Sequence, residues 1–82
     1  MIEKNSTNAY VFLNTKVGQE KNVLDKVLEL PETIEGRVTI GQWDVVMKVK
    51  VRKYEDLRPL VTNRIRSMDD VIETWTMIVA GN

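Results

Sequence analysis

Two kinds of apolar periodicity alternate along the sequence, and their order restricts the possible folds more than any other feature. In residues 45–51 (VVMKVKV) every second side chain is apolar while Lys48 and Lys50 share the opposite face, which is the period of a β-strand. In residues 19–30 the apolar positions recur at the spacing of one helix face, and Pro31 ends that helix. The chain therefore combines strands with amphipathic helix.

The same patterns assign the rest of the chain. A second helix is predicted to begin near Asp56, after a lead-in at residues 54–55, with Pro59 in its first turn and apolar positions as far as Met68. Runs of β-branched and aromatic residues predict three further strands, at residues 9–15, 33–40 and 71–80. The resulting order is strand, helix, strand, strand, helix, strand.

This order predicts a single architecture. Two strand–helix–strand units joined by a tight turn form a four-stranded antiparallel sheet with both helices on one face, because each crossover is right-handed. We therefore expect the ferredoxin-like βαββαβ fold, of the α+β class. With 82 residues there is room for one domain, which we place at residues 9–82, after a disordered or extended N-terminal tail at residues 1–8.

The first predicted strand is apolar on both of its faces. Val11 and Leu13 have one parity, whereas Tyr10 and Phe12 have the other. Such a strand is normally buried on both sides, so we expect a second copy of the chain to cover the helix-free face of the sheet. Self-association would also supplement the core of a chain this short, which hides only about 60% of its unfolded surface on folding.

Two lysines are the polar exceptions on the helix-free face. If a second copy covers that face, Lys48 and Lys50 must reach its edge or meet carboxylates such as Glu73.

The composition excludes several classes of function. Cysteine and histidine are both absent, which removes the usual zinc sites and the Ser–His and Cys–His nucleophilic pairs. We therefore expect no enzyme, no metal and no other cofactor. Twelve Lys and Arg balance twelve Asp and Glu, which gives no reason to expect direct nucleic-acid binding. A polar start and the lack of a long apolar run predict a cytoplasmic protein with no membrane contact.

The candidate binding residues lie in the turn Gly41–Asp44 and in the last strand. Gly41 and Asp44 can be explained as ordinary turn residues, and Thr74 and Thr76 as ordinary strand residues. Together they also meet the needs of a free amino acid. A carboxylate can hold its ammonium group, hydroxyls and backbone amides can hold its carboxylate, and Trp43 can supply an apolar floor.

These features resemble the effector-binding (RAM) domain of the Lrp/AsnC family of transcriptional regulators over nearly the whole chain after residue 8. The resemblance rests on the Tyr10-Val11 strand with Gly18 opening the helix, on the Gly-x-aromatic-Asp turn at residues 41–44, and on the Thr-x-Thr at residues 74–76. Where the family usually has tyrosine, this chain has tryptophan at residue 43.

The resemblance implies both an assembly and a ligand. Domains of this family dimerise through their sheets, the dimers form rings, typically octamers, and amino acids bind in clefts between dimers. By analogy, Gly41 would allow close approach of the backbone, Asp44 would contact the ligand's amino group, and Thr74 and Thr76 would line the site. Full-length members carry a helix-turn-helix domain that is not expected here. The resemblance thus implies a sensor module that could co-assemble with full-length Lrp/AsnC regulators.

Other interpretations remain open. A purely structural oligomerisation module predicts the same ring without a ligand, and ACT domains sense amino acids with the same topology. Acylphosphatase-like or oxygenase-like enzymes also use this or a related fold, although residues 14–18 provide no arginine and the chain has no histidine. RNA-binding domains stack bases on aromatic side chains of central strands, and residues 45–51 contain none.

Overall fold

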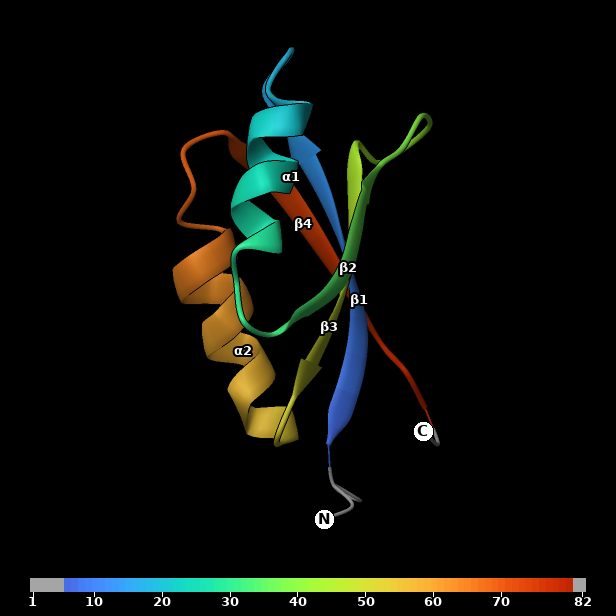
Figure 1. Ribbon diagram of the computed structural model, residues 1–82, viewed down its shortest axis with the longest axis vertical. Helices are drawn as coiled ribbons and strands as arrows, with labels where there is room; N and C mark the ends of the chain where they lie inside the picture. Colours follow the sequence, from blue (N-terminus) through green and yellow to red (C-terminus); the bar gives the residue numbers. More distant parts are fainter. Residues whose placement is uncertain (1–5, 81–82) are drawn as a thin grey trace.

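A computed structural model of the protein describes residues 6–80, and its elements follow the predicted order. All four strands belong to one antiparallel sheet in the order β2-β3-β1-β4 (Figure 1). The ferredoxin-like fold is confirmed. The elements are β1 (Thr7–Thr15), α1 (Glu20–Leu28), β2 (Thr33–Val38), β3 (Val45–Val51), a 3₁₀ turn (Tyr54–Asp56), α2 (Leu57–Pro59), a π-helical stretch (Leu60–Ile65) and β4 (Val71–Ile78).

Several boundaries differ from the prediction by two residues. Strand β1 already begins at Thr7, so the strand takes in the last two residues of the expected tail. Residues 1–5 of that tail and residues 81–82 lie outside the described residues. Strands β2 and β4 end at Val38 and Ile78, where the chain turns into the hairpin after β2, while after β4 the Val79 N–H still donates to the Asn8 carbonyl at 2.8 Å.

The second helical region, residues 54–65, is less regular than predicted. Asp56 takes the predicted N-cap position before α2, although its side chain makes no capping hydrogen bond, and the lead-in at residues 54–55 forms part of a 3₁₀ turn. Pro59 has no N–H to donate to an earlier carbonyl, which prevents a regular α-helical ladder at this point. The region ends in π geometry, where the Arg66 N–H donates to the Val61 carbonyl at 2.8 Å.

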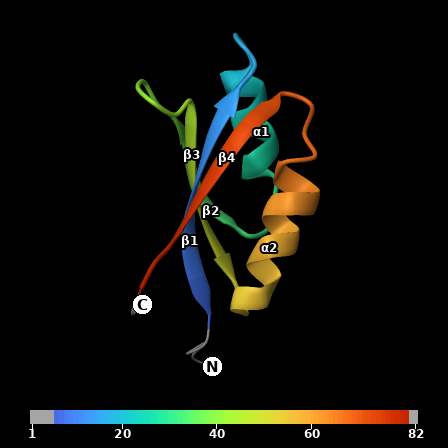
Figure 2. The same ribbon diagram turned by 180° about the vertical axis from the view of Figure 1, so that it is seen from behind.

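One face of the sheet packs against both helices to form the core (Figures 1 and 2). α1 approaches β2 closely at Gly36, where a Cβ would lie 3.0 Å from Leu24 Cδ1 and the leucine side chain would have to shift to admit it. The buried apolar side chains are Ala9, Val11, Leu13, Val23, Val27, Val45, Met47, Val49, Val51, Leu57, Leu60 and Ile65.

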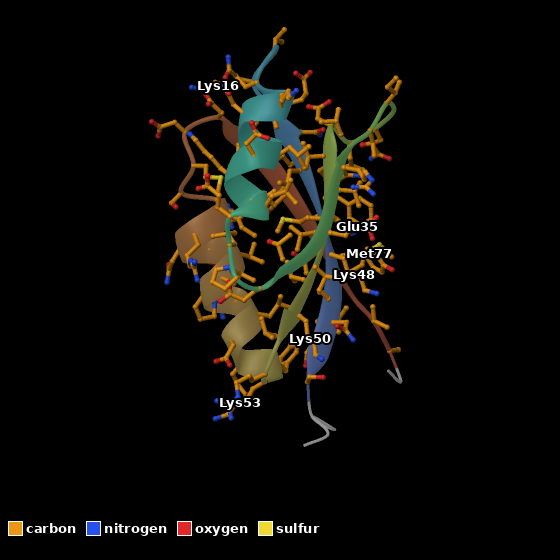
Figure 3. All side chains as sticks on the ribbon, viewed as in Figure 1. Lys16, Glu35, Lys48, Lys50, Lys53 and Met77 are labelled. Carbon is orange, nitrogen blue, oxygen red and sulfur yellow. The ribbon has the colours of Figure 1, made fainter. Side chains whose placement is uncertain are left out.

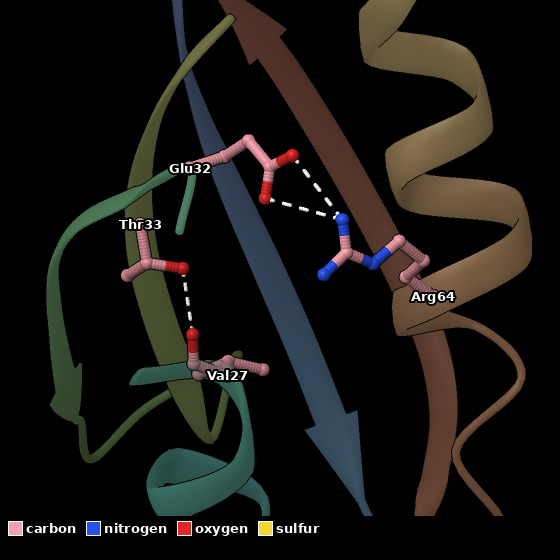
Figure 4. Close-up of polar contacts among 4 residues, drawn as sticks. All are labelled: Val27, Glu32, Thr33 and Arg64. Carbon is pink, nitrogen blue, oxygen red and sulfur yellow. Dashed lines mark hydrogen bonds and ion pairs between the residues drawn. The ribbon is translucent and has the colours of Figure 1, made fainter. Parts of the chain in front are cut away.

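Two polar contacts fix the segment between α1 and β2 (Figure 4). The Thr33 hydroxyl donates to the Val27 carbonyl in the last turn of α1 at 2.6 Å. Arg64 Nη1 lies 3.2 Å from Glu32 Oε2 and ties this segment to the second helical region. Both contacts hold the two helical elements against the same sheet face.

Candidate functional site

The helix-free face of the sheet carries an apolar band across β1 and β4. The β1–β4 register places Tyr10 opposite Met77 and Phe12 opposite Trp75 on the face that points away from the helices. Trp75, Met77 and Tyr10 are 59%, 54% and 40% exposed, respectively. Large apolar side chains that stay this open in a row mark a surface suited to a partner.

The hairpin between β2 and β3 extends this band. The Trp43 ring lies with its centroid 6.0 Å from that of Phe12, at an interplanar angle of 50°. The two rings, together with Gln42, Trp75 and Met77, line a shallow hollow of about 360 Å³. Trp43 therefore belongs to the helix-free face, as part of its apolar surface.

The other half of the same face is charged. Glu35 pairs with Lys48 across the β2–β3 ladder, and Arg37 Nη2 lies 3.6 Å from Glu35 Oε2. Lys48 Nζ lies 5.7 Å from the centre of the Tyr10 ring, within cation–π range. Figure 3 shows Glu35, Lys48 and Met77 on the same side of the sheet, away from the helices.

Glu73 was expected as a carboxylate partner for Lys48 or Lys50. Its Oε1 accepts instead a hydrogen bond of 3.4 Å from the Asn14 side chain, because the β1–β4 register places these two residues opposite each other.

Asp44 forms hydrogen bonds that connect the hairpin to the end of β1. Its Oδ2 accepts the Thr15 N–H at 2.9 Å, next to the irregularity in the β1–β4 register, and its own N–H donates to the Leu13 carbonyl at 2.9 Å. A carboxylate that satisfies a backbone N–H in this way secures the end of β1. Oδ1 has no hydrogen-bond donor within residues 6–80.

Gly41 occupies the tip of the hairpin with φ of 144°, a region that favours glycine. It is exposed, and a Cβ built there would meet nothing within 4 Å. A few residues away, the Thr39 hydroxyl donates to the Trp43 carbonyl at 2.6 Å and closes the hairpin.

Thr74 and Thr76 lie on the opposite side of the sheet from Trp43. They pair with Leu13 and Val11, whose side chains face the helices. Thr76 also lines a larger hollow beside the second helical region. Within one copy of the chain, the five predicted site residues thus form two groups, with Gly41, Trp43 and Asp44 on the hairpin and the two threonines on β4, and Trp43 lies on the other face of the sheet from the threonines.

Sequence reasoning did not assign Phe12, Trp75 and Met77 to a site, although in the sequence they all fall on one face of their strands, which was a usable signal. No sequence signal pointed to the lining of the larger hollow, since it depends on how the helical region sits against β4. Within residues 6–80 no helix is long and apolar enough to cross a membrane, and no cluster of three acidic side chains could hold a metal ion.

Comparison with known proteins agrees with this geometry. The family model for the Lrp/AsnC ligand binding domain matches residues 8–82. The HTH-type transcriptional regulator FL11 of Pyrococcus furiosus is 31% identical over 71 residues, which are 87% of this chain and 46% of that protein. The chain thus spans less than half the length of this curated relative.

Two solved structures extend the comparison. FFRP-DM1 superposes with a TM-score of 0.86 at 34% identity, over 89% of this chain and 97% of that one. A transcriptional regulator from Neisseria meningitidis, solved as a complex with L-Met, shares the fold with a TM-score of 0.80 at 13% identity, over 89% of this chain and 49% of that one.

Proposed function

This chain belongs to the Lrp/AsnC family, as a ligand-binding domain related to its transcriptional regulators, and we propose that it is an amino-acid-sensing and oligomerisation module. The observation that carries the proposal is the apolar band of Tyr10, Phe12, Trp75 and Met77 on a sheet face that no helix within residues 6–80 covers. A regulatory domain of this size gains both stability and a way to respond to a ligand when a second copy covers that band.

The proposed assembly is a homodimer with its sheets face to face, which associates further into a ring, with an octamer as the favoured size. The apolar bands of β1 and β4 would meet at the centre of the dimer. The charged half of each face, which contains Glu35 and Lys48, would meet complementary charge at the rim. The same face could accept the ligand-binding domain of a longer family member, so we include full-length Lrp/AsnC regulators among the proposed partners.

The proposed ligand is a free amino acid, held by Gly41, Trp43, Asp44, Thr74 and Thr76. Trp43 lies on the other face of the sheet from the two threonines, so the site would be completed between copies rather than within one. Asp44 Oδ1 is the oxygen that would contact the ligand's ammonium group, because Oδ2 already holds the Thr15 N–H. The L-Met complex of the Neisseria meningitidis regulator supports this ligand class on the same fold.

Calorimetry and thermal unfolding against the twenty amino acids test the proposal. At least one of them should bind and raise the Tm, and binding at the hairpin, located by amide shifts in residues 39–44, should be lost in Asp44→Asn. This variant keeps an oxygen that can accept the Thr15 N–H, so its ligand-free Tm should stay close to that of the wild type. Asp44→Ala removes that acceptor and should lower the ligand-free Tm as well.

A purely structural oligomerisation module is the second candidate, and the use of Asp44 Oδ2 inside the chain favours it. If none of the twenty amino acids binds at millimolar concentration while the chain still associates, the structural module replaces the sensor.

A further inference from the structure

A hollow larger than the one beside Trp43 lies away from the hairpin, between the second helical region and β4. It has a volume of about 590 Å³. Ile78, at 46% exposure, remains open beside it, because the helical region buries its own apolar side chains against the middle of the sheet. The lining residues are Tyr54, Glu55, Leu57, Arg58, Val61, Thr62, Thr76 and Ile78.

The lining combines an apolar surface with two opposite charges. Leu57, Val61 and Ile78 supply the apolar part. Glu55 and Arg58 are three residues apart on the helical region, so their side chains project from neighbouring positions. Neither charge forms an ion pair or a side-chain hydrogen bond with any other residue that the structure describes.

The two threonines of the hollow add uncharged hydrogen-bonding groups. The hydroxyls of Thr62 and Thr76 have no hydrogen-bond partner within residues 6–80. A carboxylate, a guanidinium and two hydroxyls therefore surround an apolar surface, and none of these polar groups is used by the fold. This is the pattern of an apolar binding site with a few polar groups that orient a small ligand.

We propose that this hollow binds an amino acid with an apolar side chain, with Arg58 on the ligand's carboxylate, Glu55 on its ammonium group, and Leu57, Val61 and Ile78 against its side chain. A guanidinium can hold a carboxylate by two parallel hydrogen bonds, and a carboxylate can hold an ammonium group in the same charge-assisted way. Thr76 supplies a hydroxyl from the strand side. The inference rests on the proposed amino-acid sensing and adds a second site to it.

This second site is distinct from the hairpin. Two β4 residues line the hollow: Ile78, which pairs with Ala9, and Thr76, which pairs with Val11 and is shared with the site proposed above. Thr74 pairs with Leu13, whose carbonyl accepts the Asp44 N–H. Figure 1 shows the hairpin at the upper end of the sheet and the start of the second helical region at the lower end. Apart from Thr76, a ligand in the hollow would therefore contact other residues than a ligand at the hairpin.

Titration of the whole ¹⁵N-labelled chain with L-leucine, L-isoleucine, L-methionine and L-phenylalanine tests the inference, with amide shifts to locate binding and calorimetry to measure affinity. Shifts are expected in residues 54–62 and 76–78. Arg58→Gln and Glu55→Gln should each weaken binding about tenfold, the loss of one charge-assisted contact. Arg66→Gln, which changes an exposed arginine outside the hollow, should leave affinity unchanged.

Analogues of the ligand provide an independent readout. For leucine, 3-methylbutylamine lacks the carboxylate and 4-methylpentanoate lacks the amino group, so each should bind about tenfold more weakly than the amino acid. The amine should bind to Arg58→Gln as it does to the wild type. It has no carboxylate, so it does not use the contact with Arg58 that this substitution removes.

The outcomes separate the two proposals. Shifts confined to residues 39–44, or an affinity unaffected by both Arg58→Gln and Glu55→Gln, would overturn the second site and leave amino-acid sensing at the hairpin in place. The absence of binding by all twenty amino acids would overturn both.

Discussion

Replacement of Trp75 by serine should dissociate the chain. Trp75 lies near the centre of the apolar band, opposite Phe12, and 59% of its surface is open in one copy. A tryptophan offers on the order of 250 Å², so a covering partner would remove about 150 Å² of it from water. At about 25 cal/mol per Å², this area stabilises the assembly by roughly 4 kcal/mol per copy, as an upper estimate.

Trp75→Ser should lower the free energy of unfolding of a single copy much less, because the exposed part of the ring makes few contacts in the hydrophobic core. In a symmetric dimer the substitution acts twice, so a weakening of at least ~1,000-fold in the dimer dissociation constant is expected even after ordering costs. Sedimentation velocity across a hundredfold range of protein concentration would measure it. The wild-type Tm should also rise with concentration, and that rise should vanish in the variant.

Leu28→Ser is the matched control. Leu28 is also a half-exposed apolar residue, but it belongs to α1 on the other side of the sheet. The Leu28→Ser substitution should therefore leave association unchanged. If Trp75→Ser sediments like the wild type at every concentration, or if the wild type itself is a monomer throughout, the argument from the apolar band is refuted.

Two stability predictions follow from the packing of α1 on the sheet, and urea unfolding measures both. Gly36→Ala should lower the free energy of unfolding by about 1–2 kcal/mol, since the new methyl group would press on Leu24 Cδ1 at 3.0 Å. When Leu24→Ala is added to the same chain, this loss should become smaller. Thr33→Val should cost about 1 kcal/mol, since it leaves the Val27 carbonyl without its 2.6 Å donor; an unchanged midpoint would contradict this role of the hydroxyl.

The sequence alone was sufficient for the order of the elements and for the side of β3 on which each residue lies. Strand β3 begins and ends as predicted, with Val45, Met47, Val49 and Val51 buried together. The alternation of side chains between the two faces of a strand depends only on neighbouring residues, so contacts with the rest of the chain do not change it. The same reasoning placed Trp75 and Met77 on one face and the two threonines of β4 on the other.

Tertiary structure decided how distant residues meet. Only strand register brings Trp43 within 6.0 Å of Phe12, and only the turn geometry gives Asp44 the Thr15 N–H as a partner. The irregular helical region around Pro59 and the hollow beside it also depend on packing. Such contacts join segments far apart in the chain, and their geometry follows from the sum of many weak interactions rather than from any local pattern.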